Sequence, residues 1–198
     1  SGTKLIDLPN WLTSFFAQIV RPFKNFLIAM NITDAGVEFP HRYRWSHSAD
    51  PGTIPTSWDI ANPDVNTGEA ELTDVQAGVI RDGLQLGDIF IIYKDRATHG
   101  LQFIGGTFIF RRYGILEQSG ILSTNCVQTI PVGRTRAHFV ATGEVDLVVF
   151  DGLRAEGLLD RRWRRFLAGD IDSNNYDRSF VTANVAEREM WFCYPESG

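Results

Sequence analysis

The sequence has few of the residues that cross-link small proteins or bind metal ions. It contains 2 Cys, 2 Met and 4 His in 198 residues. Cys126 and Cys193 are far apart in the chain and lie in apolar segments, so we expect two reduced core thiols rather than a disulfide framework or a zinc site. The histidines have no partners at metal-ligand spacing. We therefore expect no bound metal and no cofactor.

Long apolar runs and an excess of basic charge are also missing. No run reaches the ~18 residues of a membrane span. Leu5–Val20 is interrupted by Asp7, Pro9 and Asn10 and does not have the pattern of a signal peptide. We expect no membrane insertion. The formal net charge of −5 argues against a general nucleic-acid-coating surface, and it is compatible with a passage through which DNA slides without specific binding.

Motifs of the common enzyme classes are absent from the sequence. It has no Walker loop, no G-x-S-x-G, no H-E-x-x-H and no G-x-G-x-x-G. Asp170–Asn175 begins like a calcium loop, but Asn175 replaces the turn glycine and Val181 replaces the closing glutamate. His47 lies near Asp50 without a nucleophile at catalytic spacing. We therefore expect a protein that is not an enzyme.

The chain is rich in pairs of apolar strands that are separated by polar turns. Such repeats predict a mainly-β fold, namely a β-propeller-like array of antiparallel blades with one inserted amphipathic helix. We expect the whole chain, 1–198, to be part of one propeller-type domain with about three to four blades of roughly 40–50 residues each. The four pairs are Phe26–Ile32 with His41–Ser46, Ile89–Asp95 with Leu101–Tyr113, His138–Thr142 with Val145–Asp151, and Ser179–Asn184 with Glu189–Tyr194.

The segments between these pairs carry weaker signals. Leu5–Val20 fits neither a clean helix nor a clean strand. Residues 46–74 are rich in Pro, Asp, Asn and Gly and predict a long loop that Trp58 pins by packing. Asp74–Gly83 predicts a short helix. The chain opens without an initiator methionine and stops just after a strand, so we expect a fragment of a longer polypeptide.

One segment, at about residues 158–168, predicts an amphipathic helix. Its apolar residues recur at the spacing of one helical face: Leu159, Trp163, Phe166 and Leu167. Most of the remaining surface is basic: Arg161, Arg162, Arg164 and Arg165. The arginines have three explanations: a solvated face that also stabilises the C-terminal half of the helix, a contact with acidic residues of a neighbouring subunit, or a nucleic-acid site. The acidic chain disfavours the last, and the solvated face is the simplest.

Several short runs occur along the chain in an order that is more specific than any one of them. They are Trp45–Gly52 with Trp58-Asp59 and Asn62-Pro63, Asp82–Leu84 with Asp88 and Tyr93-Lys94, Phe103–Gly106 with Phe108–Arg111, Gly120–Cys126, Asp151-Gly152, Arg164–Leu167, Ile171-Asp172 and Trp191–Pro195. From about Arg21 to its end, the chain resembles a family of large β-propeller structural proteins of short-tailed bacteriophages, of the tail nozzle or tail tubular type. Members of that family are several times longer than this chain.

The resemblance implies a non-enzymatic virion protein of the phage tail, assembled in the cytoplasm of the bacterial host. Such a protein forms a homo-oligomeric ring below the portal and adaptor proteins and lines part of the DNA exit conduit. On this interpretation the candidate subunit contacts are Trp58, Arg161, Arg162, Arg164 and Arg165. The alternative is a phage receptor-binding or glycan-binding propeller module that contacts the host surface, with Trp58 and Trp45 as an exposed aromatic platform.

Overall fold

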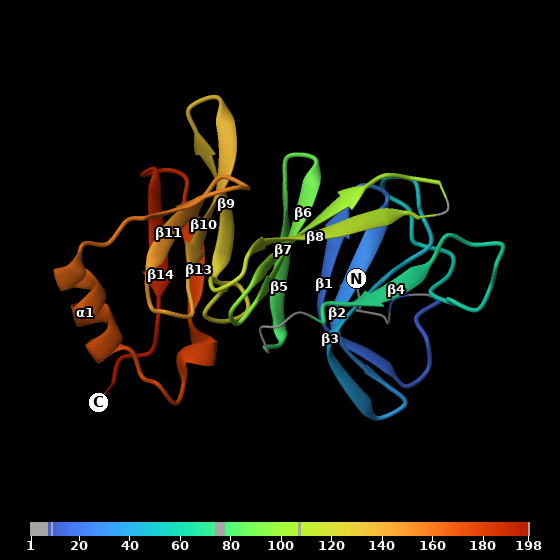
Figure 1. Cartoon of the computed structure of the whole chain (residues 1–198), viewed down its shortest axis with the longest axis horizontal. Helices are drawn as coiled ribbons and strands as arrows, with labels where there is room; N and C mark the ends of the chain where they lie inside the picture. The colour runs from blue at the N-terminus through green and yellow to red at the C-terminus, as the bar shows by residue number, and fades with distance from the viewer. Residues whose placement is uncertain (1–7, 9, 74–77, 107, 198) are drawn as a thin grey trace, which may run out of the picture. The chain divides into compact units, whose positions relative to one another are not determined.

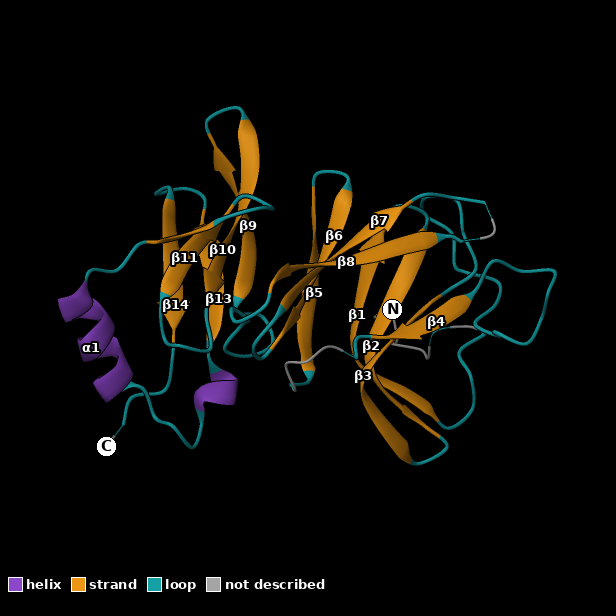
Figure 2. Cartoon of the chain, viewed as in Figure 1, coloured by secondary structure: helices purple, strands orange, loops and turns teal. Residues whose placement is uncertain are grey.

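The computed structural model describes residues 8, 10–73, 78–106 and 108–197, and the chain is mainly β (Figures 1 and 2). It groups into two compact units, residues 1–73 and 74–198. The strands of the described residues form three four-stranded sheets and one two-stranded sheet. Each four-stranded sheet joins consecutive antiparallel strands in up-and-down order, as a propeller blade does. The predicted mainly-β fold class is confirmed, whereas a single propeller-type domain over the whole chain stays a prediction.

The sheet of the first unit contains one of the four predicted strand pairs and two strands that the sequence did not predict. Its outer strands correct two expectations: β1 lies in the segment that fitted neither helix nor strand, and β4 shortens the predicted loop 46–74 to residues 46–67. Neighbouring strands in the order β1-β2-β3-β4 pair antiparallel. The strands are β1 (Phe15–Phe23), β2 (Phe26–Asp34), β3 (Val37–Trp45) and β4 (Gly68–Glu71).

Strand β2 is covered on both faces. Its consecutive residues Ile28, Ala29 and Met30 are all buried, as its continuous apolar run predicts. Ala29 and Ile32 pack with Phe15 of β1 and with Trp58 of the loop. The partly buried residues around this cluster are Leu8, Trp11, Leu12, Ala17 and Leu27. The loop and the segment before β1 therefore share one core with the sheet.

The first sheet of the second unit replaces a predicted helix. The sequence predicted a helix at 74–83. From Ile80 onward this segment belongs to β5, and residues 74–77 lie outside the described residues. The prediction is wrong from Ile80 onward because this segment pairs along its length with β6, and tertiary pairing overrides weak local preference. The strands are β5 (Ile80–Leu86), β6 (Ile89–Lys94), β7 (Thr98–Phe103) and β8 (Phe110–Leu116).

A second four-stranded sheet and a two-stranded sheet follow. The Val181 N–H donates to the Asn125 carbonyl at 2.9 Å, just before β9, and Val181 belongs to the same buried cluster as Phe139 and Phe150. The two sheets thus contribute to one core. The strands are β9 (Val127–Val132), β10 (Thr135–Ala141), β11 (Leu147–Phe150), β12 (Ala155–Gly157), β13 (Phe180–Asn184) and β14 (Glu189–Cys193).

The predicted helix is present as α1, over Arg161–Asp170, and a 3-10 turn, η1, follows at Tyr176–Arg178 (Figure 2). The helix begins later than predicted because Asp160 caps it: its side chain accepts from the Arg162 and Trp163 N–H groups, each at 2.9 Å. None of the helices in the described part of the chain has the length and apolar character that crossing a bilayer requires.

The two cysteines are free in the structure. Cys126 is buried, and its thiol donates to the Ser179 carbonyl at 3.3 Å. Burial raises the pKa of Cys126 to about 11, so this thiol stays protonated at neutral pH. Cys193 is half-buried at the end of β14. Cys126 is a core thiol, as predicted, and Cys193 is only partly one.

Candidate functional site

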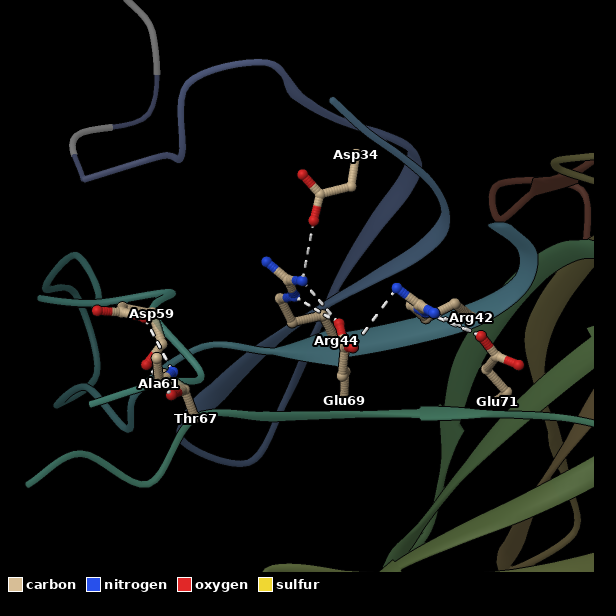
Figure 3. Close-up of polar contacts among 8 residues, drawn as sticks. All are labelled: Asp34, Arg42, Arg44, Asp59, Ala61, Thr67, Glu69 and Glu71. Atoms are coloured by element: carbon tan, nitrogen blue, oxygen red, sulfur yellow. Dashed lines mark hydrogen bonds and ion pairs between the residues drawn. The ribbon is translucent and has the colours of Figure 1, made fainter. Parts of the chain in front are cut away.

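The loop over residues 46–67 is long, but hydrogen bonds fix its path. The Asn66 N–H donates to Nδ1 of His47 at 3.1 Å. The Thr67 hydroxyl donates to the Asp59 carbonyl at 2.7 Å (Figure 3). The imidazole of His47 therefore closes the loop, which gives this histidine a structural role in place of the catalytic pair considered with Asp50.

Trp58 lies in the core of the first unit, and its assignment as a subunit contact stays a prediction. Its side chain is 1% exposed, and its ring meets that of Trp11 edge to face with centroids 4.7 Å apart. The prediction that it pins the loop by packing is confirmed. Trp45 is half-buried, and its indole N–H donates to the Asn66 carbonyl at 2.9 Å. The exposed aromatic platform expected of a receptor-binding module is therefore not formed by Trp45 and Trp58.

The solvent-facing side of the loop is acidic and partly apolar. The loop contains no Lys or Arg. We call its exposed charged and large apolar residues the acidic loop surface: Asp50, Ile54, Asp59, Ile60 and Asp64. Ile54 and Ile60 are 48% and 44% exposed. The sequence singled out Trp58 and Asp50 in this loop but not Ile54, Asp59, Ile60 and Asp64, although the lack of basic residues in the loop is visible in the sequence.

The basic residues of β3 are paired with carboxylates and are not available to a ligand (Figure 3). Arg44 is 3% exposed and lies 2.6 Å from Glu69 and 3.3 Å from Asp34. Arg42 lies 2.6 Å from Glu71. Most residues of β3 are half-buried or exposed, whereas Tyr43 and Arg44 are buried. Both arginines are paired because the short strand β4 places Glu71 opposite Arg42 and Glu69 opposite Arg44, and of the two only Arg44 is buried.

Helix α1 exposes most of its surface, including aromatic residues that the sequence placed on a buried face. Trp163 is 57% and Phe166 56% exposed, and their rings meet edge to face at 6.0 Å. Of the helix residues, only Leu167 is buried. The expectation of an apolar face packed on the core is therefore confirmed for Leu167 alone. Figure 1 shows α1 to one side of the strands β9–β14 of the second unit.

The arginines of α1 lie in its first half, which corrects one part of the solvated-face explanation. Arg161 and Arg162 are in the first turn, and the last turn has no basic residue. Cations near a helix N-terminus oppose the helix dipole, so these two arginines do not stabilise the helix through it. Arg161 and Arg165 are also four residues apart, a like-charge pair that destabilises a helix by a few tenths of a kcal/mol.

One of the four candidate arginines has a partner within the second unit. Arg164 forms an ion pair with Asp146 at 2.6 Å, on the same side of α1 as the buried Leu167. Arg161, Arg162 and Arg165 are exposed and form no ion pair with the described residues. With Trp163 and Phe166 they make up what we call the α1 surface. The structure thus separates a structural arginine from three that face solvent.

The second unit also contains a recess of about 760 Å³. Arg81 and Asp95 on its wall form an ion pair, so their charges compensate each other. Gly120 and Gly143 allow the backbone around it to approach closely: a Cβ on Gly143 would lie 3.0 Å from the Asp95 carbonyl oxygen. Its lining brings together no arrangement of nucleophile and base among the described residues.

The most strongly perturbed titratable groups of the second unit lie in the core. The Tyr93 hydroxyl and Nδ1 of His138 are 2.8 Å apart, and Nε2 of His138 is 3.2 Å from the Gln85 carbonyl. Burial lowers the pKa of His138 to about 4 and raises that of Tyr93 well above its usual value, with a further contribution from Asp82. The neutral imidazole accepts from Tyr93 and donates to Gln85, so the pair cross-links β6, β10 and β5.

We expect acid to weaken the second unit through His138. The unfolded state has the ordinary pKa of ~6.5 and the folded state about 4, so the unfolded state binds the proton more readily between these values. The free energy of unfolding should fall as the pH drops through this window, by up to about 3 kcal/mol, and level off below it. Urea unfolding of the wild type and of His138→Gln across this range measures the effect, since carboxylates contribute alike to both proteins. Parallel pH profiles would contradict it.

The segment Asp170–Asn175, which begins like a calcium loop in the sequence, ends in a turn. Asp172 accepts from the Asn174 N–H at 2.8 Å and from the Asn175 side chain at 2.6 Å. These bonds lower the pKa of Asp172. No group of three or more His, Cys, Asp or Glu able to hold a metal ion occurs among the described residues. The segment is therefore a turn that follows the helix, with Asp170 as the last residue of α1.

Comparison with known proteins does not assign the chain to a family. No protein-family model matches it, and no curated protein sequence matches it. The candidate functional features are therefore those of the structure alone, the acidic loop surface and the α1 surface.

Proposed function

We propose that this chain is a non-enzymatic structural subunit of the tail of a short-tailed bacteriophage, of the nozzle type, whose copies assemble into a ring around the DNA exit route. The observation that carries the proposal is the α1 surface. Exposed tryptophan, phenylalanine and arginine side chains together are typical of protein–protein contacts, where Trp and Arg supply much of the binding energy. The ordered resemblance to nozzle-type tail proteins supplies the virion context.

The charge of the chain supports a passive role toward DNA. The net charge of −5 supplies no general excess of cations for phosphate contacts. Arg44, a buried cation of the first unit, is paired with carboxylates. On this proposal, the portal and adaptor proteins of the tail are further partners, and DNA passes without specific binding.

The experiment is cryo-electron microscopy of the phage particle that carries the chain, with the protein first detected in purified particles by mass spectrometry. We expect a ring of copies below the portal and adaptor, around an axial channel. Density only at the tail periphery would favour the alternative, a receptor-binding or glycan-binding module. Absence of the chain from purified particles would refute the virion role.

A further inference from the structure

The two exposed surfaces are opposite in charge, and each carries large apolar side chains. We propose that the α1 surface of one copy binds the acidic loop surface of a second copy. The contact deepens the proposed function, on whose self-assembly it rests, by naming the two faces that meet. The residues involved are Arg161, Arg162, Trp163, Arg165 and Phe166 on one side, and Asp50, Ile54, Asp59, Ile60 and Asp64 on the other.

Local structure does not explain why the α1 surface carries three arginines. Arg161 and Arg162 oppose the helix dipole, and Arg161 repels Arg165. These three have no acidic partner among the described residues, in contrast to Arg164 with Asp146 at 2.6 Å. Carboxylates of another molecule would relieve this repulsion. A bound partner would also cover the exposed Trp163 and Phe166 rings.

The acidic loop surface offers carboxylates for the arginines, and its backbone is held in place. Asp50 and Asp64 are exposed, and the hydrogen bonds of the described loop do not use their carboxylates. Asp59 uses one oxygen to accept from the Ala61 N–H at 2.9 Å (Figure 3). Ile60 stands next to Asp59 and is 44% exposed. Because Trp58 anchors this segment in the core, little ordering entropy opposes binding.

The contact joins two different patches, so it is heterologous. A heterologous contact leaves one free face of each kind on every dimer and continues until a ring closes or a filament grows. A ten-residue helix is about 15 Å long and covers only part of the ~800 Å² per partner of a standard interface. The α1 surface is therefore the charged and aromatic centre of a larger contact.

Charge reversal on each side tests the contact by sedimentation velocity at low salt, up to millimolar chain. We expect the wild type to self-associate, and more weakly as salt is raised. Arg161→Glu/Arg165→Glu and, separately, Asp50→Lys/Asp64→Lys should each weaken association by roughly 10- to 100-fold. An equimolar mixture of the two variants should associate again, because each then presents one wild-type face to the other's wild-type face.

The matched control is Arg134→Glu/Arg136→Glu, which makes the same change of charge on the exposed β9–β10 hairpin and should leave association unchanged. Hydrogen exchange checks that each variant is folded. The neutral pair Arg161→Gln/Arg165→Gln should show an intermediate loss and a smaller salt dependence.

Three results would overturn the contact: a wild type that stays monomeric, reversed variants that associate like the wild type, or a mixture that does not recover. A monomer that binds DNA and loses that binding with the arginine reversal would assign α1 to nucleic acid instead. A ring in the phage tail whose assembly ignores these reversals would leave the proposed function standing and remove only this contact.

Discussion

Replacing Trp58 by alanine is expected to destabilise the first unit by about 3–5 kcal/mol, a large fraction of the stability of a small folded unit. The side chain is 1% exposed and packs among Phe15, Ala29 and Ile32. Its removal leaves a cavity beneath the loop 46–67 and removes the ring that packs against Trp11. The loop should lose its fixed path together with the core, because the same residue holds both.

Hydrogen exchange of the β1–β3 amides measures this effect, with the β5–β8 amides as reference. Protection in β1–β3 should drop by roughly a hundredfold to several thousandfold. Trp58→Phe should cost less, since it retains most of the apolar contact and removes an indole N–H that finds no acceptor among the described residues. Ile60→Ala is the surface control and should stay within about 0.5 kcal/mol of wild type. Unchanged protection in Trp58→Ala would refute the anchoring role.

Gly120→Ala is expected to destabilise the second unit by about 3–5 kcal/mol. A Cβ at this position would lie 2.1 Å from the Lys94 carbonyl oxygen and 2.4 Å from the Asp95 carbonyl carbon. Both obstacles are backbone, so no side-chain rotation relieves the clash. The shift that it forces would also break the hydrogen bond from the Ile121 N–H to the Lys94 carbonyl, 2.9 Å long.

Gly114→Ala provides the control for this change. Gly114 lies in β8, has an ordinary backbone conformation, and nothing lies within 4 Å of the position of its missing Cβ. Alanine there should be neutral or stabilise by up to about 1 kcal/mol, through a less flexible unfolded chain. Urea unfolding of the two variants beside the wild type should separate them clearly. Equal stability of Gly120→Ala and Gly114→Ala would show that the close approach of the backbone at Gly120 is not rigid.

Inner strands of the sheets could be predicted from the sequence because their side chains are buried on one or both faces. The run Phe26–Met30 and the strand Leu147–Phe150 are continuously apolar, and such short runs indicate buried strands. Outer strands could not be predicted in this way. Strand β4 reads Gly-Glu-Ala-Glu and β12 reads Ala-Glu-Gly, and such polar segments become strands only because a neighbour offers hydrogen bonds along its edge.

The candidate surfaces likewise depend on neighbouring elements and could be predicted from the sequence only in part. The arginines of α1 were visible in the sequence, but their position in the first half of the helix depends on the cap at Asp160, which set the start later than the periodicity indicated. Apolar periodicity also placed Trp163 and Phe166 on a buried face, whereas the structure exposes both. The period of the apolar residues gives the relative positions of side chains around a helix. Only the neighbouring elements decide which side of the helix is covered. The inward position of Trp58 could be predicted, because a single large aromatic residue in a long polar loop is best accommodated by packing against a core.

Pairing between consecutive strands in the described sheets affects how the chain reaches its fold. Contacts between neighbours along the sequence give a low contact order for a β protein, and short loops cost little entropy to close. The long closure is the one between β3 and β4, across residues 46–67. A chain emerging from the ribosome can therefore complete each hairpin as soon as its second strand appears. Unpaired strand edges, which drive aggregation of slowly folding β proteins, would be exposed only briefly.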